Sequence, residues 1–369
     1  MDDARLILAK SIDLASETGS YSPMKITAKA KNVCVFGLGN FFEEAFDAWN
    51  FKEKFHVNLL CDNNSSKWGQ TINGLPCVSP MELSKFDDLI VIPLVGDREP
   101  VISQMWGLNI RCLDPEECLN ESFSNIKRSK KWFSENRIMD VYDMLADEES
   151  KRVYASLLTN RIAFGRYPYS QLFSGNQYFP NFFIFHNSEV FVDCGAYTGD
   201  TLIQFINNMP GHEYKEIYAF EVDEQNFSEL QKFIINNKIK NINFYRAGVW
   251  NETGKLSFGR ETHGSFESVS ALKIGDFFLQ QTVPAIRIDD VVSKATFIKM
   301  DIEGAELNAL KGAEKTIIKN RPKLAISIYH QLQDFWEIPL YIIGLVPEYN
   351  IYVRHHGKRI IETALYACI

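Results

Sequence analysis

The sequence lacks the marks of a membrane-spanning or secreted protein. Its 369 residues contain no run of 18 apolar residues, so we expect no transmembrane helix. The amino-terminal stretch MDDARLILAK carries two acids and shows no signal-peptide pattern. The seven cysteines are odd in number and form no Cys-x-x-Cys pair, which argues against a disulfide framework and against a zinc ribbon. These absences together predict a cytoplasmic protein.

The chain also lacks an excess of positive charge. Its formal net charge of −8 argues against a surface that binds nucleic acid. Two short basic runs, Lys127–Lys131 and Arg354–Arg359, are interpreted as solvated surface, because short runs of charge rarely bind a partner. The remaining composition, 46% hydrophobic and 23% charged, is typical of a soluble globular protein, and the length suggests two domains.

Residues 30–120 show a first series of strands alternating with helical patterns. The apolar run at Val33–Phe36 is followed by a Gly-x-Gly turn and an apolar-periodic helix. Further strands are expected in HVNLLCDNN, in DDLIVIPLV and near Asn109–Leu113. This alternation predicts a small parallel sheet of Rossmann type, and we expect residues 1–125 to form the first domain.

The sequence changes character over residues 126–188. The stretch DVYDMLADEESKRVYASLLTNRI is predicted to be helical, and an aromatic-rich segment follows it. We interpret the region as a helical linker followed by a lid over a ligand, formed by Tyr167–Phe185. A simple packed linker is the alternative for this segment.

A second α/β series begins at residue 189 and continues to residue 369. Helices are expected between its strands, for example at Asn226–Asn236 and Ala305–Lys319. The tail PEYNIYVRHHGKRIIETALYACI predicts a terminal hairpin, because two strands flank a turn with no helix between them. The expected strands are Val190–Asp193, Ile217–Glu221, Ile242–Ala247, Thr296–Asp301 and Lys323–Tyr329.

The strongest local signal is the stretch EVFVDCGAYTGDTLIQF, in which a strand ends at Asp193 and a glycine turn follows. Gly195 permits a tight turn, and Gly199 lies at the start of the next helix, where free N–H groups face a ligand. The amino-acid end of S-adenosylmethionine carries both charges, so the N–H groups suit its carboxylate and Asp193 suits its ammonium. A phosphate would be repelled by this acid.

A second acid supports a nucleoside ligand. Glu221 ends the next predicted strand, 28 residues after Asp193, where a carboxylate can accept two hydrogen bonds from a ribose diol. Phe220 and Val222 are expected to flank the adenine. The residues predicted to bind the cofactor are Asp193, Gly195, Ala196, Thr198, Gly199, Thr201, Glu221, Val222 and Gly248.

Polar residues also follow the fourth and fifth predicted strands of this series. Asp301 ends the strand in TFIKMDIEGAEL, and His330 ends the strand in KLAISIYHQL, so both are expected at the sheet edge where ligands bind. We predict Asp301, Glu303 and His330 as catalytic residues, and we interpret Glu306 as a helix cap.

The roles of these catalytic residues stay open at this stage. A neutral His330 imidazole suits a base near pH 7, with Asp301 orienting it; alternatively Asp301 is the base and His330 donates a hydrogen bond to the substrate. Three acids near the site would suit a divalent ion, but no metal-binding signature is present and no metal is assigned. His355 and His356 are expected to be exposed in the hairpin turn.

From about Asp140 to Cys368 the chain resembles the FkbM family of methyltransferases. The resemblance implies a class I methyltransferase Rossmann-like sheet with a terminal antiparallel hairpin, and methyl transfer from S-adenosylmethionine to an oxygen, often a sugar hydroxyl. It places Asp193, Gly195 and Gly199 in the cofactor loop, Glu221 at the ribose and Asp301 in the methyl-transfer region. The stretches that carry it are LADEESKRVYASLLTNRI, QYF, VFVDCGAYTGDT, YAFEVDEQNFSEL, FIKMDIEGAELNALKGA and PKLAISIYH.

The first domain resembles Rossmann-like modules of bacterial surface-polysaccharide enzymes, through VFGLGN, LLCDNNSSKWGQTINGLPCVSPMEL and LIVIPLVGD. It departs from the dinucleotide fingerprint, because Phe42 stands where the third glycine would follow Gly37 and Gly39. Asp62 ends the second strand, in position for a ribose. The domain is therefore expected to bind a nucleotide or nucleotide-sugar, or to be a ligand-free scaffold.

These features predict an O-methyltransferase that acts on a sugar hydroxyl of a glycan or nucleotide-linked sugar. One alternative is a protein that holds S-adenosylmethionine or a nucleotide without catalysis, and Asp301, Glu303 and His330 are more than such a binder needs. A methyltransferase that acts on a protein or another small molecule is a second alternative. An NAD-dependent oxidoreductase is disfavoured by Phe42 and by the lack of a Tyr-x-x-x-Lys pair near the first domain.

Overall fold

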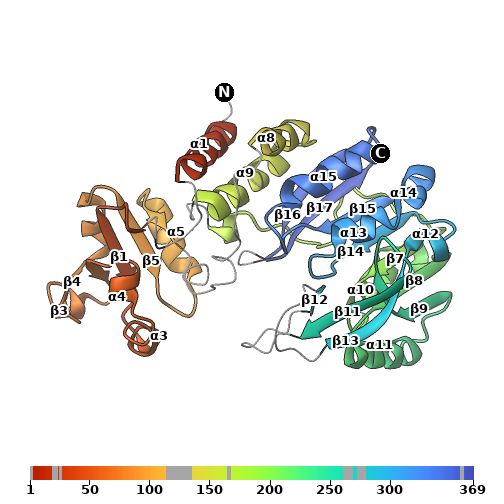
Figure 1. The fold of residues 1–369 in the computed structure, drawn as a ribbon, viewed down its shortest axis with the longest axis horizontal. Coiled ribbons are helices and arrows are strands. Elements are labelled where there is room, and N and C mark those ends of the chain that lie inside the picture. Colours follow the sequence, from red (N-terminus) through yellow and green to blue (C-terminus); the bar gives the residue numbers. More distant parts are fainter. Residues whose placement is uncertain are drawn as a thin grey trace. The chain divides into compact units, whose positions relative to one another are not determined.

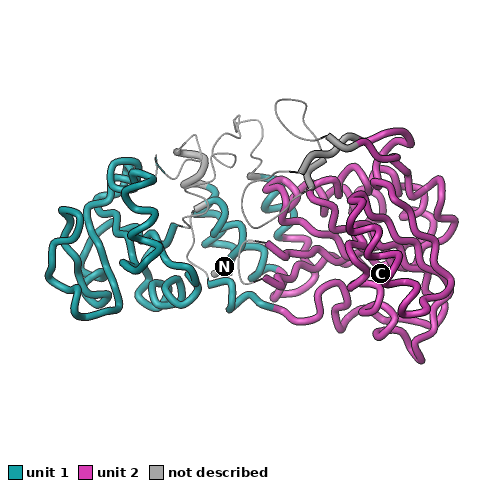
Figure 2. The backbone as a smooth tube through the Cα atoms, turned by 90° about the horizontal axis from the view of Figure 1, so that it is seen from below, with its two compact units in different colours: residues 1–142, 151–173 teal, residues 143–150, 174–369 magenta. Residues whose placement is uncertain are grey.

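The computed structural model describes residues 3–18, 24, 27–113, 135–163, 168–260, 269–271, 280–357 and 361–369. The chain divides into two compact units, shown in Figure 2. Unit 1 comprises residues 1–142 and 151–173, and unit 2 comprises residues 143–150 and 174–369. The basic run at 127–131 lies outside the described residues.

Unit 1 contains the predicted parallel sheet, with strand order β3-β4-β2-β1-β5-β6 (Figure 1). Val33 and Val35 of β1 belong to one core cluster, whereas Cys34 and Phe36 belong to another, so both faces of the sheet are buried, as in other parallel sheets. The sequence did not predict the short antiparallel pair of β3 and β4. The strands are β1 (Asn32–Phe36), β2 (Leu59–Cys61), β3 (Thr71–Ile72), β4 (Leu75–Val78), β5 (Leu89–Pro93) and β6 (Arg111–Cys112), and the helices include α1 (Asp3–Thr18), α3 (Asn40–Ala45), α4 (Phe51–Lys54) and α5 (Glu99–Gly107).

The helical stretch predicted after the first sheet forms two helices, α8 (Glu135–Met144) and α9 (Glu148–Ala163). The break has a local cause, because Asp147 caps α9 by accepting a hydrogen bond from the Ser150 N–H at 2.7 Å. Asp147 also forms an ion pair with Arg354 of the terminal hairpin at 2.6 Å. This pair explains why residues 143–150 belong to unit 2 and not to a separate linker.

Unit 2 is built on a seven-stranded sheet with the order β16-β17-β15-β14-β7-β8-β9. Five strands are parallel, and β17 joins β15 and β16 in antiparallel pairs, so the predicted terminal hairpin is confirmed. β7 lies between β8 and β14, and β15 follows β14, which brings the carboxyl ends of the motif-bearing strands to one edge. The strands are β7 (Val190–Cys194), β8 (Glu216–Glu221), β9 (Ile242–Arg246), β14 (Phe297–Met300), β15 (Lys323–Ser327), β16 (Asn350–His355) and β17 (Thr363–Cys368).

The helices of unit 2 follow the predicted alternation with one exception. The helix expected over 305–319 is broken, because a Cβ added to Gly312 would lie 2.0 Å from the Trp250 carbonyl oxygen. This close approach requires glycine, which ends one helix before the next begins. The helices are α10 (Asp200–Asn208), α11 (Glu224–Asn236), α12 (Ile288–Val291), α13 (Glu306–Lys311), α14 (Glu314–Asn320) and α15 (Asp334–Leu345).

A further sheet in unit 2 was not predicted from the sequence. Its four strands have the order β10-β13-β11-β12, and β11 pairs with β13 in an antiparallel ladder. The stretch GKLSFGR, which forms β11, contains two glycines and little apolar alternation, so it gives a weak strand signal. The strands are β10 (Gly248–Val249), β11 (Gly254–Arg260), β12 (Val269–Ala271) and β13 (Gln280–Ile286).

Aromatic residues in the later part of the segment predicted as a lid, from residue 174 onward, pack into the core of unit 2. Phe179 and Phe183 are buried in the same cluster as Phe191 of β7 and Phe297 of β14. The ring centroid of Phe179 lies 6.5 Å from that of Phe191 and 5.7 Å from that of Phe297. This packing is what the linker alternative requires. The longer segment of unit 2 begins at residue 174, ahead of the predicted domain boundary at residue 189.

In the described part of the chain, no helix is both long enough and apolar enough to cross a bilayer.

Candidate functional site

The glycine turn after β7 is shaped by close contact with the strand beside it. Gly195 has a φ of +81°, and a Cβ there would lie 2.0 Å from the Asp301 carbonyl oxygen. Gly199 has a φ of +101°, and a Cβ there would lie 2.6 Å from the Phe233 ring. Both positions combine a left-handed backbone with lack of space, so only glycine fits them. The turn therefore abuts the backbone of a residue predicted to be catalytic.

Glu221 ties this turn to the end of β8. Its carboxylate accepts hydrogen bonds from the N–H of Tyr197 at 2.9 Å and of Asp223 at 2.8 Å, one on each oxygen. Burial raises the pKa of Glu221, and the two backbone hydrogen bonds only partly oppose this effect. Each carboxylate oxygen has a second lone pair beyond the backbone bond it accepts, so the group retains capacity to bind a diol.

The other predicted cofactor residues are partly or wholly inside the fold. The Ala196 N–H donates to the Phe220 carbonyl at 2.9 Å, and a Cβ on Gly248 would lie 3.4 Å from Val222. Thr198 is half-buried in the turn. The Phe220 side chain is buried and stacks on Tyr245 at 5.1 Å between ring centroids, so the expectation that it flanks an adenine is wrong.

Asp193 is closed off from solvent. Its side chain is fully buried, with one oxygen 3.0 Å from the Lys299 Nζ and the other accepting a hydrogen bond from the Thr201 hydroxyl at 2.5 Å. Burial works to lower the pKa of Lys299, but the carboxylates of Asp193 and Asp301 outweigh it and raise that pKa. The lysine is therefore charged and already occupies the position that the sequence assigned to a ligand ammonium.

Asp301 follows β14 and lies at the centre of a polar cluster. Tyr178 donates its phenol hydrogen to Asp301 Oδ2 at 2.6 Å, and Tyr329 donates to Oδ1 at 3.1 Å. Burial works to raise the pKa of Asp301, but the charges of His330 and Lys299 together with the phenol hydrogen bonds lower it. The side chain is 21% exposed, so an ionised carboxylate is within reach of a substrate.

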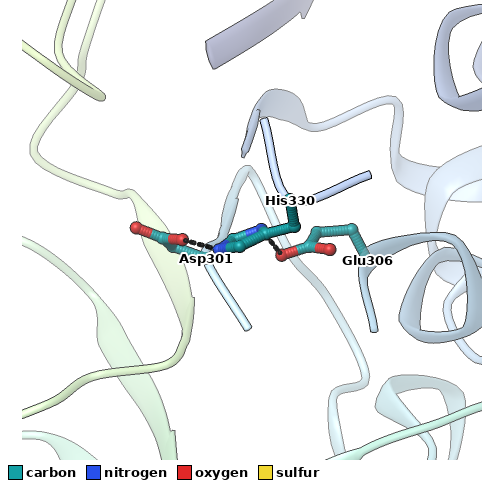
Figure 3. Close-up of side chains that lie close together, drawn as sticks. All are labelled: Asp301, Glu306 and His330. Carbon is teal, nitrogen blue, oxygen red and sulfur yellow. Dashed lines mark ion pairs between the residues drawn. The ribbon is translucent and has the colours of Figure 1, made fainter. Parts of the chain in front are cut away.

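His330 follows β15 and is surrounded by acids. Its Nδ1 lies 3.1 Å from Glu306 Oε1, and its Nε2 lies 3.5 Å from Asp301 Oδ1 and 3.3 Å from Glu303 Oε2. Figure 3 shows the imidazole between the carboxylates of Asp301 and Glu306. Burial works to lower the pKa of His330, but these acids, Glu306 foremost, raise it well above its usual value. The ring is therefore a cation near neutral pH.

The structure brings Asp301, Glu303 and His330 together, as the sequence predicted. The interpretation of Glu306 as a helix cap is wrong, because α13 has no side-chain cap: Glu306 instead accepts a hydrogen bond from the Ile302 N–H in the preceding turn at 2.9 Å and faces the imidazole. The ligand atoms of Asp301, Glu306 and His330 lie within 4.8 Å of one another, which is compact enough for a metal ion. However, each imidazole nitrogen already faces a carboxylate, so a metal on either nitrogen would have to displace that pairing.

The hairpin histidines are not exposed as expected. His355 is fully buried, and its Nδ1 lies 2.9 Å from the Thr363 hydroxyl. His356 is half-buried between the Ser174 carbonyl and the Tyr366 hydroxyl, and burial lowers its pKa to about 4. Both histidines lie at the start of the turn, where packing of the hairpin covers them.

Three site residues were missed by sequence reasoning. Lys299 gave a usable signal, because a charged residue inside the apolar strand TFIKM needs a buried partner. Tyr178 and Tyr329 lie in QYF and PKLAISIYH, two stretches that carry the family resemblance, but only the folded chain shows that both phenols reach Asp301. Tyr178 also has a φ of +65°, a left-handed backbone that is uncommon for an aromatic residue and is frequent near functional sites.

The glycine turn of unit 1 is organised in the same way, but its acid is occupied. Asp62 accepts hydrogen bonds from the N–H of Leu38 at 2.8 Å and of Asn64 at 2.8 Å, and its Oδ2 also binds the Lys67 ammonium at 3.0 Å. Oδ2 of Asp62 thus carries two of these bonds and Oδ1 carries one, and nucleotide binding by unit 1 stays a prediction. This arrangement favours the ligand-free scaffold over the nucleotide site.

The comparison with protein families decides the nature of unit 2. The family model of the methyltransferase FkbM domain matches residues 193–360. The match covers 168 of the 369 residues, and all of them belong to unit 2. The chain is therefore a methyltransferase, and the match includes the glycine turn, Glu221, Lys299, Asp301 and His330. No curated protein matches the chain.

One solved structure shows the same fold over the whole chain. The methyltransferase FkbM from Methylobacillus flagellatus KT is similar over 100% of this chain and 99% of its own, with 23% sequence identity and a TM-score of 0.64. An rRNA methylase from Streptococcus thermophilus is 16% identical over 50% of this chain and 87% of its own, with a TM-score of 0.33. Fibrillarin from Aeropyrum pernix, in complex with S-adenosyl-L-methionine, is 10% identical over 50% and 67%, with a TM-score of 0.31. The first likeness shows the fold, and the other two are too distant to add to it.

Proposed function

We propose that the protein transfers a methyl group from S-adenosylmethionine to a hydroxyl oxygen of a glycan or nucleotide-linked sugar. The observation that carries this proposal is the direct approach of the glycine turn to Asp301, where Gly195 leaves no room for a Cβ beside the Asp301 carbonyl. A donor held by the turn and an acceptor held at Asp301 would lie next to each other. Such proximity is the main requirement of a displacement reaction.

The cofactor residues fit a nucleoside with an amino-acid end. Glu221 would bind the ribose through the lone pairs that its backbone hydrogen bonds leave, and Val222 and Gly248 would lie near the base. The free N–H groups at the start of α10, after Gly199, would face the cofactor carboxylate. S-adenosylmethionine, when bound, supplies the methyl group.

Asp301 is the group that would take the proton of the acceptor hydroxyl. A hydroxyl becomes acidic as its oxygen is alkylated, so an ionised carboxylate suffices as the proton acceptor even though its pKa is low. The phenols of Tyr178 and Tyr329 hold the carboxylate in one orientation through hydrogen bonds to its two oxygens. These phenols and carboxylates together suit a substrate that presents several hydroxyls, as a sugar does.

His330 takes the second of the two roles left open by the sequence. An imidazolium held between acids cannot act as a base, but it can donate a hydrogen bond to the acceptor and keep Asp301 ionised. Glu303, which is 42% exposed at the same edge, would accept a hydrogen bond from a second substrate hydroxyl.

Methyl transfer from isotope-labelled S-adenosylmethionine to a panel of nucleotide-sugars and cell-surface glycans tests the proposal. We expect Asp301→Asn and His330→Ala each to lower kcat by at least about 100-fold while S-adenosylmethionine still binds. Glu348→Gln, at an exposed ion pair with Arg321, is the matched control and should retain activity. Near-normal turnover by both site variants would overturn the assigned roles, and labelling only of protein acceptors would overturn the sugar assignment.

A further inference from the structure

Lys299 is a lysine in the interior of a buried strand. It lies on β14 with its side chain only 3% exposed, and in the sheet it is paired in register with Asp193 of β7. Withdrawing an ammonium from water is costly, and a well-packed apolar residue often serves a strand core equally well. A lysine at such a position therefore points to a task for its charge.

The contacts of Lys299 converge on the glycine turn. Its Nζ donates to the Gly195 carbonyl at 2.6 Å and lies 3.0 Å from Asp193 Oδ1. The Cys194 carbonyl lies at 3.4 Å, and the ring of Tyr178 lies with its centroid 5.2 Å away. The ammonium thus binds the backbone of the turn as well as the buried acid, so its role extends beyond neutralising one carboxylate.

Lys299 has one carboxylate from the cofactor turn and one from the proposed acceptor position near its ammonium. Asp193 begins the cofactor turn, whereas Asp301 is the acid proposed to meet the acceptor, and both carboxylates act on the same ammonium. Because Asp193 is occupied by Lys299 and Thr201, its carboxylate is not available to a ligand ammonium. The peptide groups around Gly195 are also occupied, because the Gly195 carbonyl accepts from Lys299 and the Gly195 and Ala196 N–H groups donate to the Phe220 carbonyl. The N–H groups at the start of α10 are therefore what the turn presents to the amino-acid end of the cofactor, and Lys299 acts on them by fixing the turn.

We infer that Lys299 is a positioning residue for the amino-acid end of S-adenosylmethionine. Its ammonium fixes the Gly195 peptide and holds Asp193 out of the ligand site, so that the turn keeps one conformation before the cofactor arrives. This inference rests on the proposed function, since it requires that the turn bind S-adenosylmethionine. It predicts that loss of Lys299 weakens the binding of ligands that carry the amino-acid end and leaves the binding of the nucleoside alone unchanged.

Two ligands that resemble the product allow the contributions of the amino-acid end and of the nucleoside to be measured separately. S-adenosylhomocysteine carries the amino acid, whereas 5′-methylthioadenosine has the nucleoside and lacks it. Calorimetry should show that the charge-neutral double variant Lys299→Met with Asp193→Asn loses about tenfold or more in affinity for S-adenosylhomocysteine. Its affinity for 5′-methylthioadenosine should change less than about threefold. The double variant is chosen because Lys299→Met alone would leave a buried, uncompensated Asp193.

A second buried pair gives the matched control. Lys323 of β15 binds Glu189 at 2.8 Å, near the opposite end of the strands from the glycine turn. The double variant Lys323→Met with Glu189→Gln should lower the melting temperature without changing the ratio of the two affinities.

The outcomes are distinct. Equal losses for both ligands, or no loss for either, would overturn the positioning role of Lys299. A wild-type protein that binds neither ligand would instead overturn the proposed cofactor site. If the Lys299 and Asp193 double variant fails to fold, Lys299→Arg is measured in the same way: its guanidinium retains the charge but not the geometry, and a selective loss for S-adenosylhomocysteine is again expected.

Discussion

Replacing Glu221 by alanine should weaken the cofactor and destabilise unit 2 at the same time. The carboxylate accepts one backbone hydrogen bond on each oxygen, from Tyr197 and from Asp223. The Tyr197 side of the turn is open to water, but the Asp223 N–H is in a buried hydrogen bond, so its acceptor is not replaced by solvent. Loss of one buried acceptor should lower the free energy of unfolding by about 1–3 kcal/mol.

The effect on binding is worked out separately. Each hydrogen bond from a ribose hydroxyl to a charged acceptor contributes about 1.5–3 kcal/mol, so loss of even one should weaken binding at least about tenfold. Calorimetric titration with S-adenosylhomocysteine measures this change, and thermal unfolding of the same sample measures the change in stability.

Unit 1 supplies a matched control for this experiment. Asp62 makes the same pair of backbone hydrogen bonds, one buried, to Leu38, and one nearer solvent, to Asn64. Asp62→Ala should therefore lower stability by a similar amount and leave the affinity for S-adenosylhomocysteine unchanged. Unchanged affinity in Glu221→Ala, or an equal loss in Asp62→Ala, would falsify the assignment of Glu221 to the ribose.

Three further predictions concern the charges around the site. Glu306→Gln should lower the pKa of His330, because Glu306 is the largest of the acidic influences that raise it; an unchanged pKa in an NMR titration of labelled histidine would contradict this. Burial works to raise the pKa of Asp147, but its hydrogen bonds to Arg354 and Ser150 outweigh it and lower that pKa. The ionised Asp147 carboxylate therefore adds to the free energy of unfolding above the unfolded pKa of about 4, and this contribution is lost as pH falls through the lower folded pKa. Asp147→Asn should lower the melting temperature at pH 7. The melting temperature of this variant should also depend less on pH below about pH 4. Equal acid sensitivity in both proteins would refute this sign. Methyl transfer should survive chelating agents, because both His330 nitrogens face carboxylates of the chain; loss of activity restored by added divalent ion would reassign the cluster as a metal site.

The parallel strands of the large sheet in unit 2 could be predicted because they are short apolar runs, several of which end in acidic residues. The five predicted parallel strands agree with the observed ones to within two residues at either end, and the terminal hairpin agrees as well. Adjacency of β14 and β15 then follows from the sheet order, which is why Asp301 and His330 could be expected on one edge. The sheet containing β11 and β13 could not be found in this way, since its strands lack clear alternation.

The sequence predicted several of the residues that form the candidate site, but it did not predict their contacts and charges. A motif can show that Asp193 lies near the end of a strand, but not that Lys299 of the neighbouring strand reaches it, because that depends on register. Similarly, the sequence leaves the protonation of His330 open, whereas the positions of Glu303 and Glu306 around the ring raise its pKa. Residues were assigned from local pattern, whereas their roles depend on partners distant in sequence.

The two units share a strand, a glycine turn and a following acid, but the surroundings of the acid differ. In both, the acid after the second strand receives the backbone N–H of the turn and that of the residue two positions further on. The difference is the ammonium of Lys67, which takes a third position on Asp62, whereas Glu221 has no cation among its hydrogen-bond partners in the described structure. The shared pair of backbone hydrogen bonds stabilises the turn in each unit, so the similar shape of the two turns does not by itself indicate that both bind a nucleoside. We expect the remaining lone pairs to decide binding. Lys67→Met frees one of them on Asp62 and also removes the bond from the ammonium to the Leu38 carbonyl at 2.6 Å, but it keeps the two backbone bonds to Asp62, so unit 1 should stay folded. A gain in affinity for adenosine, measured by calorimetry, would show that occupation of the acid limits ribose binding in unit 1, and an unchanged affinity would contradict this.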